Sequence, residues 1–417
     1  MNIIDAIAGK VKRILSGEYI LYRYTERISG AVVYSAERCG GSRMDFNGLK
    51  RQYNALREEI FWRVERVTEE GRYTGGSEIM ELEERLAEYV GVSFCVSCGS
   101  GSDALALMLT AAGIGAGDAV FVPDLTSFAV AEAVSRIGAE PVFVQPDGRT
   151  YNMCPRELGH SIEEYVGEAR PRAVIAADMF GLPANHQALE RVAEKHGLIL
   201  FEDAAQSLGA QSNGKRAGSF GVASAISFSP EAPLGCWGDG GAVLTCDRGL
   251  AERVRSLGGH GRGPDGSVHT RIGYGSRLDR VQAAVLLAKL EAFRRCELPA
   301  VRRAATLYEK RLQGMEGIVL PFVPEGVLPA WRRYNVRLAS SAEREEAQRR
   351  LQRAGIPSEA PCVRAVSRQP VYAGRGSSER TCADALCETL LSLPMHPYIT
   401  EGEIAEVCGI LSGDGEK

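Results

Sequence analysis

The sequence predicts an α/β protein with a mostly parallel central sheet. Short apolar runs rich in strand-forming residues alternate with helical patterns over the larger part of the chain. Such alternation is typical of a parallel sheet covered by helices on both faces. With 417 residues and 45% hydrophobic content, the chain can bury a large core and is long enough for two domains. The expected strands are residues 93–97, 119–123, 140–145, 172–180, 198–204, 223–229 and 241–246.

Helical patterns complete the expected order of elements. Residues 77–90 form one helix, and a glycine-rich turn leads into another at residues 102–113. A long helix is expected over residues 276–312, bent near Pro299. Beyond it, the strand-like residues 332–339, the helical residues 342–355 and a polar loop at 363–381 indicate a smaller α+β region.

Three regions follow from this order: an N-terminal extension at residues 1–43, a large domain at 44–294 and a small C-terminal domain at 295–417. Residues 1–15 place apolar side chains at helical spacing with basic side chains opposite, which is compatible with a membrane-surface helix. A short packing helix or a start-site artefact are the alternatives. Because the chain from Met44 onward reads like a natural beginning, we do not expect membrane contact through residues 1–15.

Composition narrows the classes of function. The formal net charge is −4, and the basic residues are scattered rather than clustered, so we do not expect nucleic-acid binding. The 11 cysteines in a long chain without an apparent secretory signal favour reduced thiols in the cytoplasm. Cys95 and Cys98 form a lone CxxC motif; a second ligand pair for a metal is missing, so we expect no metal site.

The stretch "SCGSGSDALALML" places a glycine-rich turn between a strand and a helix. Glycines allow close approach of a ligand, and the free amides of a helix N-terminus attract anions. Ser102 or Asp103 is the expected N-cap, and phosphate binding competes with a plain helix cap as the reason for this composition.

A second candidate is Asp203, at the carboxyl end of the apolar strand in "LILFEDAAQSLGA". Ligand-contacting groups of α/β sheets occur at this end of the strands, and a carboxylate there needs a partner. A helix cap for the following residues is the alternative role.

The order and spacing of these motifs resemble a known family. The glycine turn, "EDAAQSLGA", "ISFSP", "PLGCWGDGGAVLT", "RIGYGSRLDRVQAA" and "LSLPMHPYIT" look like the DegT/DnrJ/StrS pyridoxal-phosphate aminotransferases that act on nucleotide-linked keto sugars. The resemblance covers about Asp45 to Gly409. It implies a fold type I architecture, similar to aspartate aminotransferase, a homodimer with shared active sites, and a role in amino-sugar or surface polysaccharide synthesis.

The resemblance also assigns residue roles. Asp203 matches the acid that pairs with the pyridinium nitrogen of pyridoxal phosphate, and Gln206 matches the residue beside the ring hydroxyl. Gly101 and Ser102 match the phosphate turn, and Ser227 matches the serine that adds a phosphate contact.

Other family positions are changed. Ala232 occupies the place of the Schiff-base lysine, so no catalytic residue is expected there. Ser127 stands where an aromatic residue stacks on the cofactor, with Phe128 next to it. Gly275 replaces the asparagine lent by the partner subunit, and Ser367 replaces the histidine of the substrate loop.

Alanine cannot form the bond to the cofactor or shuttle the proton. Neither adjacent Glu231 nor Lys215, expected in a surface turn, is a good substitute. The sequence therefore favours a catalytically impaired homologue that binds pyridoxal phosphate non-covalently, if at all, and a nucleotide sugar. Two alternatives stay open: an active sugar aminotransferase whose lysine was substituted, and a non-catalytic partner of an active relative.

Overall fold

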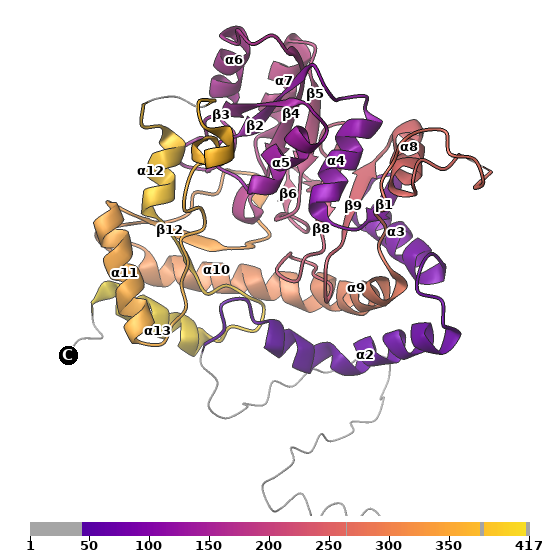
Figure 1. Ribbon diagram of the computed structural model, residues 1–417. Helices are drawn as coiled ribbons and strands as arrows, with labels where there is room; N and C mark the ends of the chain where they lie inside the picture. The colour runs from indigo at the N-terminus through magenta and orange to yellow at the C-terminus, as the bar shows by residue number, and fades with distance from the viewer. Residues whose placement is uncertain (1–43, 264, 376–378, 414–417) are drawn as a thin grey trace, which may run out of the picture. The chain divides into compact units, whose positions relative to one another are not determined.

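A computed structural model describes residues 44–263, 265–375 and 379–413 (Figure 1). The predicted extension at residues 1–43, including the amphipathic pattern at 1–15, lies outside the described residues. Within the described ranges, no helix has the length and apolar character needed to cross a membrane.

Seven strands form the main sheet in the order β1-β9-β8-β5-β4-β2-β3. Strand β9 runs antiparallel to both of its neighbours, and the remaining strands are parallel to one another. The predicted mostly parallel sheet is therefore confirmed. The strands are β1 (Phe94–Cys98), β2 (Asp118–Pro123), β3 (Glu140–Val144), β4 (Arg170–Ala177), β5 (Ile199–Asp203), β8 (Ala223–Ser227) and β9 (Gly241–Thr245).

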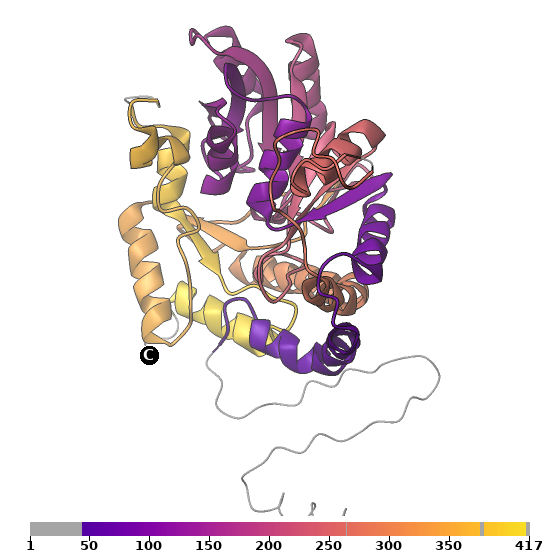
Figure 2. The same ribbon diagram turned by 45° about the vertical axis from the view of Figure 1, so that its right-hand side comes forward.

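Helices cover both faces of this sheet, as Figures 1 and 2 show. Successive residues of β2 point to opposite faces: Val120 and Val122 join one buried cluster with α4, while Phe121 joins another with α6 and α7. Both faces of the sheet are buried, which explains why the strands are continuous apolar runs in the sequence. The helices are α3 (Ser77–Val90), α4 (Gly101–Ala111), α5 (Phe128–Arg136), α6 (Pro155–Glu163), α7 (His186–Lys195) and α8 (Arg248–Gly258).

One long helical stretch leads into the C-terminal part of the chain. Helix α9 (Arg280–Ala292) continues through the π-helical segment Phe293–Glu297 into α10 (Leu298–Leu312). The predicted boundary at residues 294 and 295 falls inside this continuous segment, and the division into two domains stays a prediction. Helix α2 (Leu49–Glu70) packs along α9 in both views (Figures 1 and 2).

The C-terminal part is built on a small antiparallel sheet in the order β10-β12-β13. Its own apolar cluster combines this sheet with α10, α11 and α13. A third small sheet joins β11 to the β6–β7 hairpin. These elements are β6 (Gln211–Ser212), β7 (Lys215–Arg216), β10 (Ile318–Val319), β11 (Val327–Leu328), β12 (Tyr334–Leu338), β13 (Leu390–Leu393), α11 (Ser341–Arg353), α12 (Cys382–Thr389) and α13 (Glu401–Ser412).

Two expectations differ from the structure in detail. The strand expected over residues 172–180 ends at Ala177, and a 3-10 turn follows over Met179–Gly181. The described residues of the polar segment, 363–375 and 379–381, are largely a loop, but they contain short 3-10 turns at Val366–Arg368 and Pro370–Tyr372. Tyr372 anchors this segment because its buried ring packs on Phe143 and its hydroxyl contacts Ser135 Oγ at 3.0 Å.

Candidate functional site

The turn between β1 and α4 passes close to the end of β8. Ser100, not Ser102 or Asp103, is the N-cap: its Oγ accepts a hydrogen bond from Asp103 N at 3.0 Å. The prediction was wrong by two residues because α4 begins at Gly101, earlier than residue 102, so the side chain that can reach the free amides belongs to Ser100.

Gly101 is required by the close approach of β8. A β-carbon at this position would lie 2.8 Å from Ser227 Cβ, so a larger residue would displace the turn or the strand. The free amides at the start of α4 therefore lie beside the Ser227 hydroxyl. This arrangement has the hydrogen-bond donors that a phosphate needs.

A third segment supports this turn. Ser276 Oγ accepts a hydrogen bond from Gly99 N at 2.9 Å and donates one to Asp103 Oδ2 at 2.7 Å. Arg136 forms an ion pair with the other oxygen of Asp103 at 3.0 Å. Sequence reasoning missed Ser276, whose position in "RIGYGSRLD" was the available signal.

Asp203 is the last residue of β5 and is 6% exposed. Its Oδ1 accepts a hydrogen bond from Ala205 N at 3.0 Å. Burial raises the pKa of Asp203 to about 6, and repulsion by Asp178 adds to the effect. No salt bridge to Asp203 is found within the described ranges. A cationic N–H donor placed against its carboxylate would therefore offset the free-energy cost of burying the charged form of Asp203.

Gln206 lies on the segment that follows Asp203. Its Oε1 accepts a hydrogen bond from Phe180 N at 3.0 Å. Phe180 has a φ of 60°, a left-handed conformation that is costly for a bulky residue. The Gln206 contact holds this strained turn beside the carboxyl ends of β4 and β5.

The loop after β8 carries Ala232. Its amide donates to Ser229 O at 2.8 Å, which closes a tight turn. Neighbouring Glu231 is half exposed and pairs with Arg332 at 2.8 Å, so its carboxylate is engaged elsewhere. A cavity of about 70 Å³ borders this turn; Gln52, Glu231, Ala232, Glu297, Arg332 and His396 are among its lining residues.

Two lysines were compared with the position of Ala232, and one of them contacts its loop. Lys215 lies on the exposed hairpin strand β7, as the sequence predicted for a surface turn. Lys289 in α9 is buried, and its Nζ donates to Gly235 O at 2.7 Å. Burial lowers the pKa of Lys289 to about 8. Sequence reasoning did not single out Lys289, because its position in an apolar helix gives no sign of the loop that it contacts.

The residues that the sequence comparison predicted to be changed have structural roles of their own. Ser127 is the N-cap of α5, and the Phe128 ring packs near Tyr372 with centroids 5.8 Å apart. Ser367 is buried and donates from N and Oγ to the two oxygens of Asp124, at 2.8 and 3.0 Å. A β-carbon at Gly275 would lie 2.8 Å from His260 Cε1.

The CxxC motif lies on β1. Cys95 and Cys98 are both buried, and burial raises the pKa of both thiols, that of Cys98 to about 12. Both sulfurs therefore stay protonated at neutral pH, which disfavours a nucleophilic role.

Comparisons with known proteins find similar chains among sugar aminotransferases. The chain is 37% identical over 369 residues to the UDP-2-acetamido-2-deoxy-3-oxo-D-glucuronate aminotransferase of Pseudomonas aeruginosa. The matched region covers 88% of this chain and 99% of that protein. It is also 37% identical over 379 residues to a dTDP-3-amino-3,4,6-trideoxy-alpha-D-glucose transaminase of Streptomyces venezuelae, covering 89% and 96% of the two chains.

Solved structures have the same architecture. A DegT DnrJ EryC1 StrS aminotransferase from Brucella abortus matches with a TM-score of 0.85 and 39% identity, over 90% of this chain and 100% of that one. DesV of S. venezuelae, solved in complex with a ketimine intermediate, matches with a TM-score of 0.85 and 36% identity over the same shares. The model of the DegT/DnrJ/EryC1/StrS aminotransferase family matches residues 54–412. The chain therefore belongs to the DegT/DnrJ/EryC1/StrS aminotransferase family.

Proposed function

We propose that this protein binds a pyridoxal-phosphate-type cofactor non-covalently, together with a nucleotide sugar, and does not sustain transamination. The observation that carries the proposal is Ala232 at the position of the Schiff-base lysine. Lys289 contacts the same loop, but its amine is bound to Gly235 O, and Lys215 is exposed on a hairpin. Without a positioned amine, the effective molarity of about 10⁵ M or more that such a group provides is lost.

The residues present fit the cofactor. The start of α4 and Ser227 offer donors to a phosphate, and Gly101 leaves room for it by lacking a side chain. The buried Asp203 carboxylate suits a pyridinium N–H, where it would hold the proton on the ring nitrogen, and Gln206 would flank the ring hydroxyl. When bound, the cofactor supplies an electron sink for charge developing on the substrate carbon.

Nucleotide-sugar binding rests on the relatives, whose names specify UDP- and dTDP-linked sugars. By the same family resemblance, the protein acts as a homodimer in the cytoplasm or as the inactive partner of a lysine-bearing relative. Amino-sugar synthesis is the corresponding pathway class.

The surroundings of Ala232 favour natural loss of activity over substitution of one residue to trap an intermediate. Ser127 caps a helix, and Ser367 is tied to Asp124 by two hydrogen bonds. Neither position retains its family residue, and both replacements are integrated into the fold. A change made at one residue would have left the other positions intact.

Cofactor trapping tests this proposal. We expect the wild-type protein to bind pyridoxal phosphate reversibly and to show no covalent adduct after borohydride reduction. It should also show no turnover with glutamate and a UDP- or dTDP-linked keto sugar. Ala232→Lys should gain the adduct at residue 232, detected by peptide mapping, while turnover stays at least 100-fold below that of an active relative. Ala232→Met, which has a similar length but no amine, is the matched control.

Three results would contradict the proposal. A borohydride-fixed adduct on wild-type Lys289 or Lys215 together with turnover would identify an active enzyme with a relocated lysine. Full turnover by Ala232→Lys would point to a trapping substitution. A wild-type protein that retains no cofactor would remove the cofactor-binding function, and co-purification with a lysine-bearing relative would then favour the partner role.

A further inference from the structure

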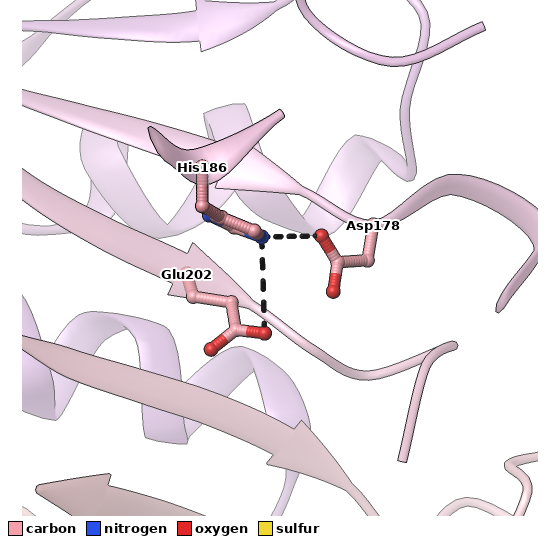
Figure 3. Close-up of side chains that lie close together, drawn as sticks. All are labelled: Asp178, His186 and Glu202. Atoms are coloured by element: carbon pink, nitrogen blue, oxygen red, sulfur yellow. Dashed lines mark hydrogen bonds and ion pairs between the residues drawn. The ribbon is translucent and has the colours of Figure 1, made fainter. Parts of the chain in front are cut away.

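Three ionisable side chains lie close together (Figure 3). Asp178 follows β4, His186 begins α7 and Glu202 precedes Asp203 in β5; their exposed fractions are 1%, 4% and 0%. His186 Nε2 lies 2.7 Å from Asp178 Oδ1 and 3.9 Å from Glu202 Oε1. The imidazole also stacks on the Phe220 ring with centroids 4.3 Å apart, so its orientation is fixed.

Protein donors already satisfy the four carboxylate oxygens. Asp178 accepts from Ala184 N through Oδ1 and from Ser207 Oγ through Oδ2. Glu202 accepts from Gly218 N through Oε1 and from Phe220 N and Ser224 Oγ through Oε2. The three side chains offer metal-ligand atoms within 4.8 Å of one another. A metal ion would have to displace these donors, so a hydrogen-bond network accounts for the cluster better.

This network joins the segments that carry the site residues. Ser207, bound to Asp178, follows Gln206 directly, and Asp178 N donates to Asp203 O at 3.0 Å. Ser224, bound to Glu202, lies on β8, the strand that ends at Ser227. His186 lies between the two carboxylates and so couples the support of Asp203 and Gln206 to that of Ser227.

Charge makes the imidazole essential to this arrangement. Burial lowers the pKa of His186, but the carboxylates of Asp178, Glu202 and Glu190 outweigh it and leave that pKa raised. Burial, together with the Asp178 charge, raises the pKa of Glu202. Without a cation between them, two buried carboxylates would repel each other until one of them took up a proton.

We propose that Asp178, His186 and Glu202 are positioning residues that hold Asp203, Gln206 and Ser227 in the geometry that binds the cofactor. Where it concerns cofactor affinity, this inference rests on the proposed function. Glu202 and Asp203 are consecutive residues of β5, so their side chains point to opposite faces of the sheet, and Glu202 supports the strand from the face that Asp203 does not occupy. We therefore expect loss of the network to lower cofactor affinity more than a comparable core substitution does.

Replacement of the imidazole tests the role. We expect His186→Leu to weaken pyridoxal phosphate binding at least 10-fold at pH 8, measured by absorbance titration. The loss should grow as pH rises above about 8, because burial and the Asp178 charge raise the pKa of Glu202 to about 8 and its carboxyl then gives up its proton. His186→Gln keeps an N–H donor but carries no charge, so its affinity should lie between those of wild type and His186→Leu. Leu189→Ala is the matched control because Leu189 is fully buried on the same helix.

Hydrogen exchange on the cofactor-free protein provides an independent readout. His186→Leu should lose amide protection at residues 203–208, whereas Leu189→Ala should lose it within α7. If wild type fails to bind pyridoxal phosphate, the proposed function fails, and exchange alone decides the positioning role. Equal affinity losses in the Leu189→Ala and His186→Leu variants, or matching exchange patterns, would overturn it.

Discussion

At the residue scale, Asp203 shows how a binding group is maintained at a cost in stability. Its pKa is raised to about 6 mainly by burial, from 3.8 for an ordinary aspartate. Because the folded-state pKa is the higher one, the folded protein binds this proton more tightly than the unfolded chain. Stability is therefore lost as pH rises from about 4 to about 6, and the full penalty, about 2–3 kcal/mol, applies above that range.

Asp203→Asn should remove this penalty, since the amide keeps an acceptor for Ala205 N but carries no charge. We expect the cofactor-free variant to be more stable than wild type by about 1–3 kcal/mol at pH 7.5. The two proteins should be equal near pH 4, as measured by urea denaturation. Cofactor affinity should fall at the same time, because the proposed partner of the ring nitrogen is lost. A constant difference between the two proteins across this pH range would show that Asp203 titrates normally.

Residue roles were only partly predictable. The placement of Asp203 at the end of an apolar strand follows from strand periodicity. The Asp178–His186–Glu202 network does not, because its members belong to three elements and are joined only by the way β4, α7 and β5 pack. Ser100 was missed for a smaller reason, a shift of the helix start by one residue.

At the element scale, α4 depends on contact with β8 as much as on its own cap. The turn that begins α4 and the last residue of β8 touch through Gly101 and Ser227. This contact is invisible in the local sequence, where Gly101 reads as part of a flexible turn. In the structure it is a close approach between two elements that both face the candidate phosphate site.

Gly101→Ala should therefore be costly. The new methyl group would overlap Ser227 Cβ, and relief would require α4 or β8 to move. We expect a loss of about 1–3 kcal/mol in unfolding free energy and at least 10-fold weaker binding of pyridoxal phosphate. Gly409→Ala in α13 is the control: no atom lies within 4 Å of the new β-carbon, so helix propensity should make it neutral or stabilising by up to about 1 kcal/mol. Equal behaviour of the two variants would contradict the packing argument.

At the scale of the whole molecule, the first and last described helices are joined by ion pairing. Arg51 in α2 donates to Tyr398 O and Glu403 Oε2, both at 2.9 Å, and its guanidinium also contacts Glu403 Oε1. Glu403 also closes the capping box of α13 with Thr400. Burial alone would raise the pKa of Glu403, but the Arg51 and Thr400 donors outweigh it and lower that pKa to about 2.

Because this folded-state pKa is depressed, the stabilisation is present above about pH 4.5 and is lost as pH falls toward about 2. Glu403→Gln should cost about 1 kcal/mol at pH 7, allowing for solvent screening of a partly exposed pair. The difference should vanish near pH 2, as followed by denaturant titration at each pH. Glu81→Gln, which breaks the exposed pair with Arg85, should change stability by less than about 0.5 kcal/mol.

The fold as a whole was the most predictable feature. Strands buried on both faces gave long apolar runs, and helices between them implied parallel pairing. The position of β9 in the sheet was harder to predict, because nothing in its local sequence pattern shows that it inserts antiparallel between β1 and β8.

That insertion has a consequence for synthesis on the ribosome. Strand β1 pairs in the sheet only with β9, whose partner residues lie far along the chain: Phe94 pairs with Thr245 and Cys98 with Gly241. The segment leading to the phosphate turn must therefore wait for β9 to emerge before its edge of the sheet can close. Until then the growing chain has the strands that carry Asp203 and Ser227 but lacks the closed sheet edge before the candidate phosphate turn, so we expect the candidate site to be completed late in translation.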